Sequence, residues 1–468
     1  MKQFRWKAYL FIALISASFA CKSVLPENST STQNPPEVTY TAVQAFDGSN
    51  TPLASTVDWV SFFESSYWQE DIVNDNNGGV YVLENRAIPD ASDNASVMLY
   101  LSKITSNGTK EWQISLTETD YNGSESFATD ALGNVYIASS SPKTWGNPIV
   151  PYVGSGYRGF DVYITKIDKN GNVIWNTFTG ESWASTISVD TQGNLYILTF
   201  DRLNTAKNSI YSLVKLDTNG NILFDTPISG LNYVVPYYLV AHPNGSIYLS
   251  GEYVDFDGNL TTDIFLARLT SDGSLEWEIN IGGIESTEDI ISLYGQKIQV
   301  DQNGSAYIFG ISSASWGNPI NPYDGGFATD SPDNIWLSGD EYFVAKINNN
   351  GELAWHTFLN NTTHLNGATL DNNGNLYISG NSNSNWGNPI KAYNPENKGD
   401  GFVAFIDTNK GSISWNLFVG EDGEDGLSEM IIMDNYLYVL GGTNKPFGNI
   451  INPSNDNGRI FIAKILLQ

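Results

Sequence analysis

Side chains that could catalyse a reaction are few in this chain and show no diagnostic spacing. Of its three histidines, His242 falls in a predicted turn and His356 in a predicted strand, which leaves His364 as the plausible free base. A Ser-His-Asp group is recognised by its geometry, so spacing alone does not assemble one here. Paired carboxylates for glycoside cleavage could exist among the 51 acidic residues, but no pattern marks which two. We therefore assign no catalytic residue, metal ligand or cofactor from the sequence.

The only cysteine, Cys21, directly follows a short apolar leader, where its thiol could be acylated. Residues 1–7 carry three basic side chains, and residues 8–20 are almost wholly apolar, as in a secretory signal. The run Ser18-Phe19-Ala20-Cys21 is similar to a bacterial lipobox, although Ser18 stands where leucine is usual. We predict a lipoprotein signal peptide over 1–20 and lipidation at Cys21. The alternative is ordinary secretion with the thiol unmodified.

The leader and the residues after it predict an address in the cell envelope. Lys22 follows the cysteine, and by similarity to known sorting rules the absence of Asp there disfavours retention at the inner membrane. We expect an outer-membrane lipoprotein, facing the periplasm or the surface and held to the membrane by its lipid. Residues 21–56 are rich in Ser, Thr, Asn and Pro and predict a flexible tether.

The charge of the chain restricts its partners. The formal net charge is -28 at pH 7. Such acidity opposes binding to the phosphates of nucleic acids and to anionic lipid head groups. We therefore predict no nucleic acid partner.

From residue 57 onward the chain repeats a unit of four predicted strands. A turn with Asp and Gly leads into an aromatic strand, as in Asp130-Ala131-Leu132-Gly133-Asn134-Val135-Tyr136-Ile137. An apolar strand with a lysine and a strand with a tryptophan follow. The aromatic strand recurs around Tyr81, Tyr136, Tyr196, Tyr248, Tyr307, Tyr377 and Tyr438. This period predicts an all-β fold, a seven-bladed β-propeller of four-stranded blades over residues 57–468.

The last repeat lacks its fourth strand, because the chain stops at Gln468 soon after the third. The segment Asp58-Trp59-Val60-Ser61-Phe62-Phe63 has the pattern of a fourth strand, although it precedes the first repeat. We therefore predict that the N-terminal strand pairs with the C-terminal blade and closes the ring.

Two charged positions recur in register with the repeat. The turn aspartates, for example Asp130 and Asp371, are expected to accept backbone N–H bonds within tight hairpins rather than to bind calcium. Third-strand cations recur as Lys103, Lys166, Lys215, Arg268, Lys346 and Lys464. We expect these cations to pack between blades and to reach carboxylates, with the turn aspartates as candidates.

Aromatic residues on one rim are the candidate ligand-binding residues. The sequence Trp-Gly-Asn-Pro-Ile occurs at residues 145–149, 316–320 and 386–390, with a variant at 447–451, always in the long link between second and third strands. These tryptophans could stack on sugars or hold a partner. The alternative is that each packs over its own blade edge. The predicted ligand-binding residues on this rim are Trp145, Tyr152, Trp316, Phe327, Trp336, Trp386 and Tyr393.

The elements Gly-Asn-x-Tyr-Ile, Phe-Val-Ala-Lys-Ile and Trp-Asn-Thr-Phe resemble those of the bacterial seven-bladed β-propeller repeat (SBBP) family, often found in envelope lipoproteins. The resemblance covers about residues 57–468. It implies a fold and an envelope location, and it implies hardly any chemistry.

We predict a lipid-anchored binding or scaffold module for an envelope or extracellular protein or glycan. Two alternatives remain open. One is a propeller enzyme, a glycan hydrolase or lyase. It would use carboxylates on the rim that carries the long links between second and third strands. The other is an assembly partner for outer-membrane proteins similar to BamB, which predicts an exposed apolar or strand-edge patch.

Overall fold

The computed structural model divides the chain into two compact units, Met1–Ala42 and Val43–Gln468. All described residues belong to the second unit. They are 43–46, 52–55, 57–63, 70–87, 96–120, 126–154, 161–180, 183–202, 209–228, 231, 234–254, 260–281, 291–292, 298–312, 314–324, 341–359, 362–391, 393, 399–420, 424–445, 447–452 and 459–467. The signal peptide, Cys21 and most of the predicted tether lie outside them and stay predictions. Within the described residues, no helix is long and apolar enough to cross a bilayer.

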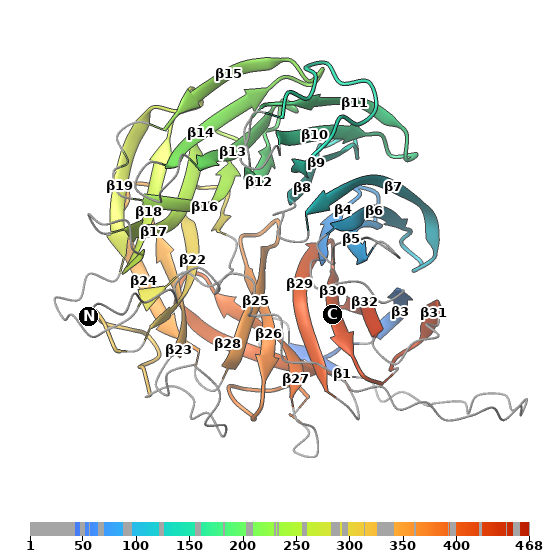
Figure 1. Ribbon diagram of the computed structural model, residues 1–468. Helices are drawn as coiled ribbons and strands as arrows, with labels where there is room; N and C mark the ends of the chain where they lie inside the picture. Colours follow the sequence, from blue (N-terminus) through green and yellow to red (C-terminus); the bar gives the residue numbers. More distant parts are fainter. Residues whose placement is uncertain are drawn as a thin grey trace, which may run out of the picture. The chain divides into compact units, whose positions relative to one another are not determined.

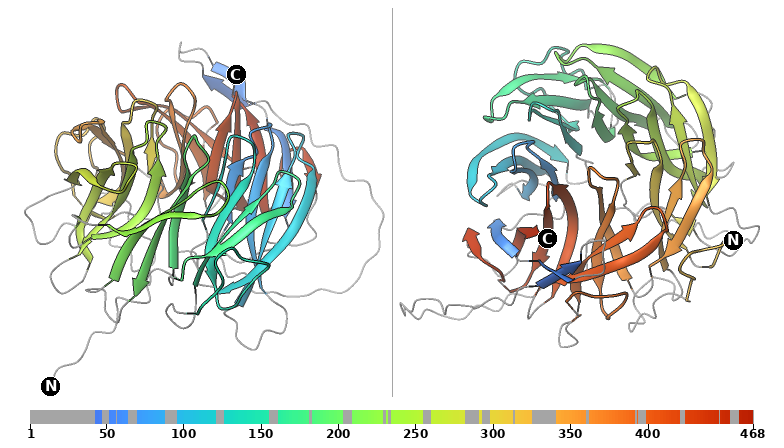
Figure 2. Two further views of the ribbon diagram at one scale, coloured as in Figure 1. Left: turned by 90° about the horizontal axis from the view of Figure 1, so that it is seen from above. Right: turned by 180° about the vertical axis from the view of Figure 1, so that it is seen from behind.

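Seven sheets, the blades, form a ring within this unit, and all their strands pair antiparallel except β31 with β3 in the last blade (Figure 1, Figure 2). Strands follow one another from the centre of the ring outward. Blade one contains β4 (Glu70–Asn74), β5 (Val80–Ala87), β6 (Ser96–Ile104) and β7 (Lys110–Asp120). Blade two contains β8 (Ser126–Thr129), β9 (Val135–Ser141), β10 (Asp161–Ile167) and β11 (Val173–Phe178). Blade three contains β12 (Trp183–Val189), β13 (Leu195–Arg202), β14 (Ser209–Leu216) and β15 (Ile222–Pro227).

The other blades have the same order, with small additions. Blade four contains β16 (Val234–Ala241), β17 (Ile247–Val254), β18 (Leu260–Leu269) and β19 (Leu275–Ile281). Blade five contains β20 (Ile291–Ser292), β21 (Gln299–Val300), β22 (Ala306–Ser312), β23 (Glu341–Ile347) and β24 (Leu353–Phe358). Blade six contains β25 (Thr362–Leu370), β26 (Leu376–Ser382), β27 (Asp400–Asp407) and β28 (Ser412–Val419). Blade seven contains β29 (Asp425–Met433), β30 (Tyr436–Thr443), β32 (Arg459–Leu466), β3 (Val57–Phe63) and β31 (Ile450–Asn452).

The predicted closure of the ring is confirmed. The N-terminal strand β3 pairs antiparallel with β32, placing Trp59 opposite Lys464 and Phe62 opposite Phe461. Trp59 and Phe62 are both buried. Because β3 is the fourth strand of the last blade, the ring is held shut by hydrogen bonds between the two ends of the fold.

A hairpin of β1 (Val43–Phe46) and β2 (Pro52–Ser55) lies within the segment that the sequence predicts as a tether. Both strands carry apolar residues, and four pairs of residues face each other across them. Composition identified the polar stretch of residues 21–56 but did not predict that a local strand pair interrupts it.

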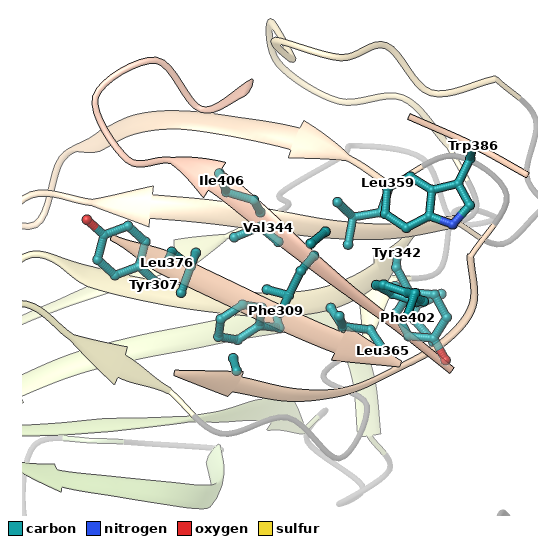
Figure 3. Packing of buried hydrophobic residues seen from close by; sticks show 14 of the residues in the cluster. Tyr307, Phe309, Tyr342, Val344, Leu359, Leu365, Leu376, Trp386, Phe402 and Ile406 are labelled. Carbon is teal, nitrogen blue, oxygen red and sulfur yellow. The ribbon is translucent and has the colours of Figure 1, made fainter. Parts of the chain in front are cut away.

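The seven predicted tyrosines are all buried between blades. Several satisfy their hydroxyl groups on a turn of the following blade. The Tyr81 hydroxyl donates to the carbonyl oxygen of Gly133 at 2.9 Å, and the Tyr248 hydroxyl donates to that of Gly304 at 2.9 Å. Aromatic bodies thus fill the space between sheets while their polar ends stay hydrogen-bonded. Figure 3 shows such a cluster, in which side chains of blades five and six meet.

The turn aspartates form hairpins, as predicted. Asp130 Oδ1 accepts hydrogen bonds from the backbone nitrogens of Leu132 at 3.0 Å and Asn134 at 2.9 Å. Gly133 has φ of 78°, a left-handed conformation that favours glycine. The first tight turn of blade two is therefore stabilised by its own aspartate.

Five of the six third-strand cations donate to a carbonyl of a neighbouring blade, as predicted, whereas Lys215 lies over the ring of Tyr196 in its own blade. Lys166 Nζ and Trp175 Nε1 both donate to the carbonyl oxygen of Thr218 in blade three, at 3.3 and 3.1 Å. Lys166 Nζ also lies 3.6 Å from Asp130 Oδ2, so the turn aspartate is its carboxylate partner. We call this arrangement of a lysine or arginine and a tryptophan on one carbonyl the clasp. It recurs from Lys346 and Trp355 to Thr408.

Candidate functional site

The Trp-Gly-Asn-Pro-Ile segments lie along the outer edge of the outermost strand of their own blades. In blade two the backbone nitrogen of Ile149 donates to the carbonyl oxygen of Asn176 at 2.9 Å, and that of Phe178 donates to Val150 at 3.1 Å. In blade seven the corresponding segment is β31, which pairs parallel with β3. These segments, which we call edge covers, satisfy backbone groups that an exposed edge strand would leave open.

Blades five and six have the same arrangement. The backbone nitrogen of Ile320 donates to the carbonyl oxygen of His356 at 2.8 Å, and that of Ile390 donates to Asn416 at 2.8 Å. The glycine of each cover has positive φ, and a Cβ atom at Gly387 would lie 2.8 Å from Asn416 Oδ1. Glycine is therefore required for the close approach of the cover to the strand.

The tryptophans of the edge covers are packed rather than open. Trp316 and Trp386 are 8% and 6% exposed, and Trp145 is half-buried. Trp316 stacks on His356 with ring centroids 3.7 Å apart, and Trp386 meets Phe402 edge to face. This geometry favours the structural alternative for Trp316 and Trp386, since most of each ring is covered. Ligand binding by these residues stays a prediction.

Sequence reasoning missed the residues that hold each cover. Asn176 and Asn416 donate from Nδ2 to the carbonyl oxygens of Trp145 and Trp386, the latter at 2.9 Å. His356 does the same from Nε2 to the carbonyl oxygen of Trp316 at 2.8 Å. A signal was present, because these three residues directly follow the outer-strand tryptophan in three blades that carry the motif.

A tyrosine completes each of these three covers. Tyr152 and Tyr393, both predicted as ligand residues, are half-buried and pack edge to face against Phe178 and Phe418, with centroids 5.7 Å apart. Tyr323, which the sequence analysis missed, occupies the same place in blade five. The two remaining predicted ligand residues, Phe327 and Trp336, lie outside the described residues.

Buried acids at the start of the third strand anchor the loops after two of the covers. Asp161 Oδ2 accepts from the backbone nitrogens of Val153 and Gly154 at 2.8 and 2.7 Å. Glu341 Oε2 accepts from the backbone nitrogen of Asp324 at 3.0 Å. Burial raises the pKa of Glu341 to about 7. These carboxylates have a positioning role toward the loops.

All three histidines contact other residues. His364 lies in β25, half-buried, with Nδ1 3.4 Å from the Tyr342 hydroxyl, and its role as a base stays a prediction. Burial lowers the pKa of His364 and of His356. His242 Nε2 lies 2.9 Å from the carbonyl oxygen of Asp301. In the described part of the chain, no three acidic, histidine or cysteine side chains gather as metal ligands.

A groove of about 450 Å³ lies where the edge covers of blades five and six meet. We call it the five-six groove. Its walls come from the end of one cover, the beginning of the next, and the start of β28. The lining residues are Ile320, Asn321, Trp386, Gly387, Asn388, Ser412 and Ile413. The lining thus combines apolar side chains with two amides and a hydroxyl, and none of these seven side chains ionises near neutral pH.

One polar atom at the groove has no partner in the described structure. The indole Nε1 of Trp386 is buried and makes no hydrogen bond with any described residue. In Figure 3 Trp386 lies at one end of the cluster, near Phe402. Buried indole nitrogens usually find an acceptor, and Nε1 of Trp316 in the cover of blade five likewise has none among the described residues, so this donor is a shared feature of the two covers.

Comparisons with known proteins add no family. No family model matches the chain, and no curated protein matches it, so the resemblance to SBBP proteins stays a prediction. Similar solved structures include a protein of unknown function from Bacteroides caccae, at 14% identity over 64% of this chain and 93% of that chain, with a TM-score of 0.32. A subtype N10 neuraminidase-like protein of A/little yellow-shouldered bat/Guatemala matches at 11% identity over 86% and 91%, with a TM-score of 0.34. The Dos1 propeller matches at 9% identity over 86% and 94%, with a TM-score of 0.39.

Proposed function

We propose that this protein is a lipid-anchored binding module of the cell envelope and that its five-six groove receives a neutral glycan. The observation that carries the proposal is the lining of the groove. Ile320 and Ile413 offer apolar contact for the C–H faces of a sugar ring, and Asn388 and Ser412 offer hydrogen-bonding groups for its hydroxyls. Its volume lies in the range of small-ligand sites.

The groove is supported by rigid neighbours, which favours binding. The clasp from Lys346 and Trp355 to Thr408 joins the two blades that form the walls. Both covers are themselves hydrogen-bonded to outer strands. A preformed site loses less conformational entropy on binding than a loop that must become ordered.

Charge supports a neutral ligand over an acidic one. The chain carries a net charge of -28, and the groove lining contributes no cation that could offset it. An acidic polysaccharide would therefore be repelled at long range, with the effect strongest at low salt. Hydrogen bonds and apolar contacts do not depend on this field.

A glycan array with the chain from Lys22 to Gln468, followed by titration of each hit, tests the proposal. We expect binding to neutral glycans, weakened at least about tenfold by Ile320→Arg, because the new charge would enter the groove. Ile320 is 49% exposed, so the change is tolerable for folding. Ile149→Arg is the matched control, since Ile149 occupies the same place in blade two and is 46% exposed.

Two results would contradict the proposal. Equal affinity of the Ile320→Arg variant would place the glycan elsewhere. Shortening of the bound glycan on prolonged incubation would show an enzyme in place of a binding module.

A further inference from the structure

Among the described residues, the outer strands of blades one, three and four (β7, β15 and β19) have no edge cover, whereas those of blades two, five, six and seven have one. The sheet of blade three ends at β15, and no described residue hydrogen-bonds to its outer side. Figure 1 shows β15 as the outermost strand of its blade. Its second and third strands are joined by residues 203–208, whereas residues 142–160 join those of blade two.

The short connection of blade three cannot supply a cover. A chain advances at most about 3.6 Å per residue, and neighbouring strands are about 4.8 Å apart. Crossing β14 and β15 and returning would use the whole of residues 203–208, with none left to pair along the edge. The link of blade three therefore supplies no cover for β15, and no described residue pairs with its outer edge.

Register relates β15 to a covered strand residue by residue. Asp225 lies opposite Val214 in the sheet, as Asn416 lies opposite Ala404 in blade six. In blade six, the backbone groups of Asn416 are those that the cover engages. The equivalent groups of blade three belong to Asp225, and the residue before it with the same orientation is Leu223.

Apolar surface lies at the same place. Leu223 is 55% exposed and lies on the same face of β15 as Asp225. Ile149, from the cover of blade two, is 46% exposed and reaches the beginning of β15, because its Cδ1 atom would be 2.8 Å from a Cβ atom on Gly220. The corresponding Ile320 forms a wall of the five-six groove, so Ile149 holds beside β15 the place that Ile320 holds beside β28.

The polar residue at this edge differs from those under the covers. Asn176, His356 and Asn416 donate a hydrogen bond to a carbonyl of their covers. Asp225 is exposed, and an ionised carboxylate can only accept. A segment at this edge is therefore favoured when it brings a cation, because a charge-assisted hydrogen bond is stronger than a neutral one.

Pro227 limits how far pairing extends. Pro227 occupies the position in β15 that Phe178 occupies in β11. Phe178 donates its backbone N–H to the cover of blade two, whereas proline has no backbone N–H to donate. The edge can thus pair with a short strand but does not extend into a continuous sheet. A second copy of this chain is a poor occupant, because two chains with a net charge of -28 each repel one another.

We propose that β15 is a docking site for a short extended segment of another protein, in which an apolar and a basic residue stand two positions apart and therefore face the same way. The segment adds to the outer edge of blade three as a strand. Its apolar side chains contact Leu223 and Ile149, and a lysine or arginine meets Asp225. This site is separate from the five-six groove and does not depend on the glycan proposal.

The probe for the test is a fluorescent peptide, Ser-Val-Ser-Lys-Ser-Val, in which Val and Lys face the same way, with Ser-Val-Ser-Glu-Ser-Val as its acidic counterpart. We expect fluorescence anisotropy to show binding of the basic peptide alone, weakened at least about tenfold by Leu223→Lys. Ser414→Lys is the matched control, because Ser414 precedes Asn416 as Leu223 precedes Asp225, on an edge that is already covered. Asp225→Asn should weaken the basic peptide and reduce the salt dependence of its binding.

Backbone pairing has its own readout. Two methylated peptides are compared, one with its odd-numbered and one with its even-numbered amide nitrogens methylated. Only one of these sets of N–H groups faces β15, so one peptide should lose binding and the other should keep it. Equal binding of both methylated peptides, or unchanged affinity of Leu223→Lys, would overturn the proposal. A dimer of the chain that Leu223→Lys dissociates would instead show that a second copy occupies the edge. Ile320→Arg, which tests the glycan proposal, should leave peptide binding unchanged, so the two proposals fail separately.

Discussion

Replacing Trp59 by alanine tests whether the N-terminal strand holds the ring closed. Trp59 is 2% exposed, its indole lies over Gly108 of blade one, and its Nε1 donates to the carbonyl oxygen of Ser106 at 2.9 Å. Lys464 Nζ donates to the same carbonyl at 3.1 Å. This is the clasp at the junction of blades seven and one.

The expected cost follows from these contacts. Truncation of a buried tryptophan to alanine costs about 3–5 kcal/mol of unfolding free energy, counting lost burial and the cavity. The lost hydrogen bond adds little, because the Ser106 carbonyl keeps Lys464 as a donor and is not left unsatisfied. We therefore expect a loss of about 3–5 kcal/mol in urea unfolding.

The position of Trp59 predicts a second effect that an internal clasp lacks. Trp175→Ala is the matched control, because Trp175 makes the same contact with Thr218 and is 9% exposed. Strand β3 is joined to its blade only by pairing, whereas β11 continues from β10 through a tight turn. Hydrogen exchange should therefore show early opening of β3 in Trp59→Ala but no early opening of β11 in Trp175→Ala.

Two results would refute this reasoning. A loss below about 1 kcal/mol for Trp59→Ala would show that the contact does not stabilise the closure. Rapid exchange of the β3 amides in the unchanged protein would show that the ring is already open in solution.

Three further predictions concern the covers, a buried acid and the anchor. Gly317→Ala should destabilise the fold by about 1–2 kcal/mol in urea unfolding, because φ is 55° and the new Cβ atom would lie 3.0 Å from His356 Cε1; Gly374→Ala, which meets nothing within 4 Å, should cost less. The pKa of Glu341 is raised to about 7, so its carboxyl group stays protonated to higher pH in the folded than in the unfolded state, and the free energy of unfolding should fall as pH rises from about 4.5 to 7. Glu341→Gln should remove that fall, and a variant with the same pH profile as the unchanged protein would contradict this prediction. Labelling cells with a fatty acid should mark the protein and fail to mark Cys21→Ser, whereas equal labelling of both would place the lipid elsewhere or exclude it.

Much of the fold could be predicted because each repeat carries its own local instructions. Asp130 and Gly133 form a turn from residues within one hairpin, and the position of Tyr136 after that turn follows from strand alternation. The closing strand was also predictable, since Trp59 and Phe62 repeat the spacing of fourth strands elsewhere. Such signals depend on neighbours in sequence.

The candidate site was less predictable, because its contacts join distant segments. Trp316 could face solvent or its own blade from the sequence alone, and only its stacking on His356 decides between them. Tyr323 was missed for the same reason, because its partner Phe358 lies in a distant segment, whereas Asn416 was missed although it directly follows the outer-strand Trp415. The five-six groove requires two covers to meet, which no single repeat encodes.

The sequence by itself determined that the chain forms seven similar blades with tight turns on one rim, because repeat period, turn chemistry and strand alternation are local properties. Only the tertiary structure showed that the outer edges of blades two, five, six and seven are covered, whereas no described residue covers those of blades one, three and four. That outcome depends on hydrogen bonds between a long link and the fourth strand of its blade, as between Ile149 and Asn176. Those bonds exist only after the sheet has brought both segments together.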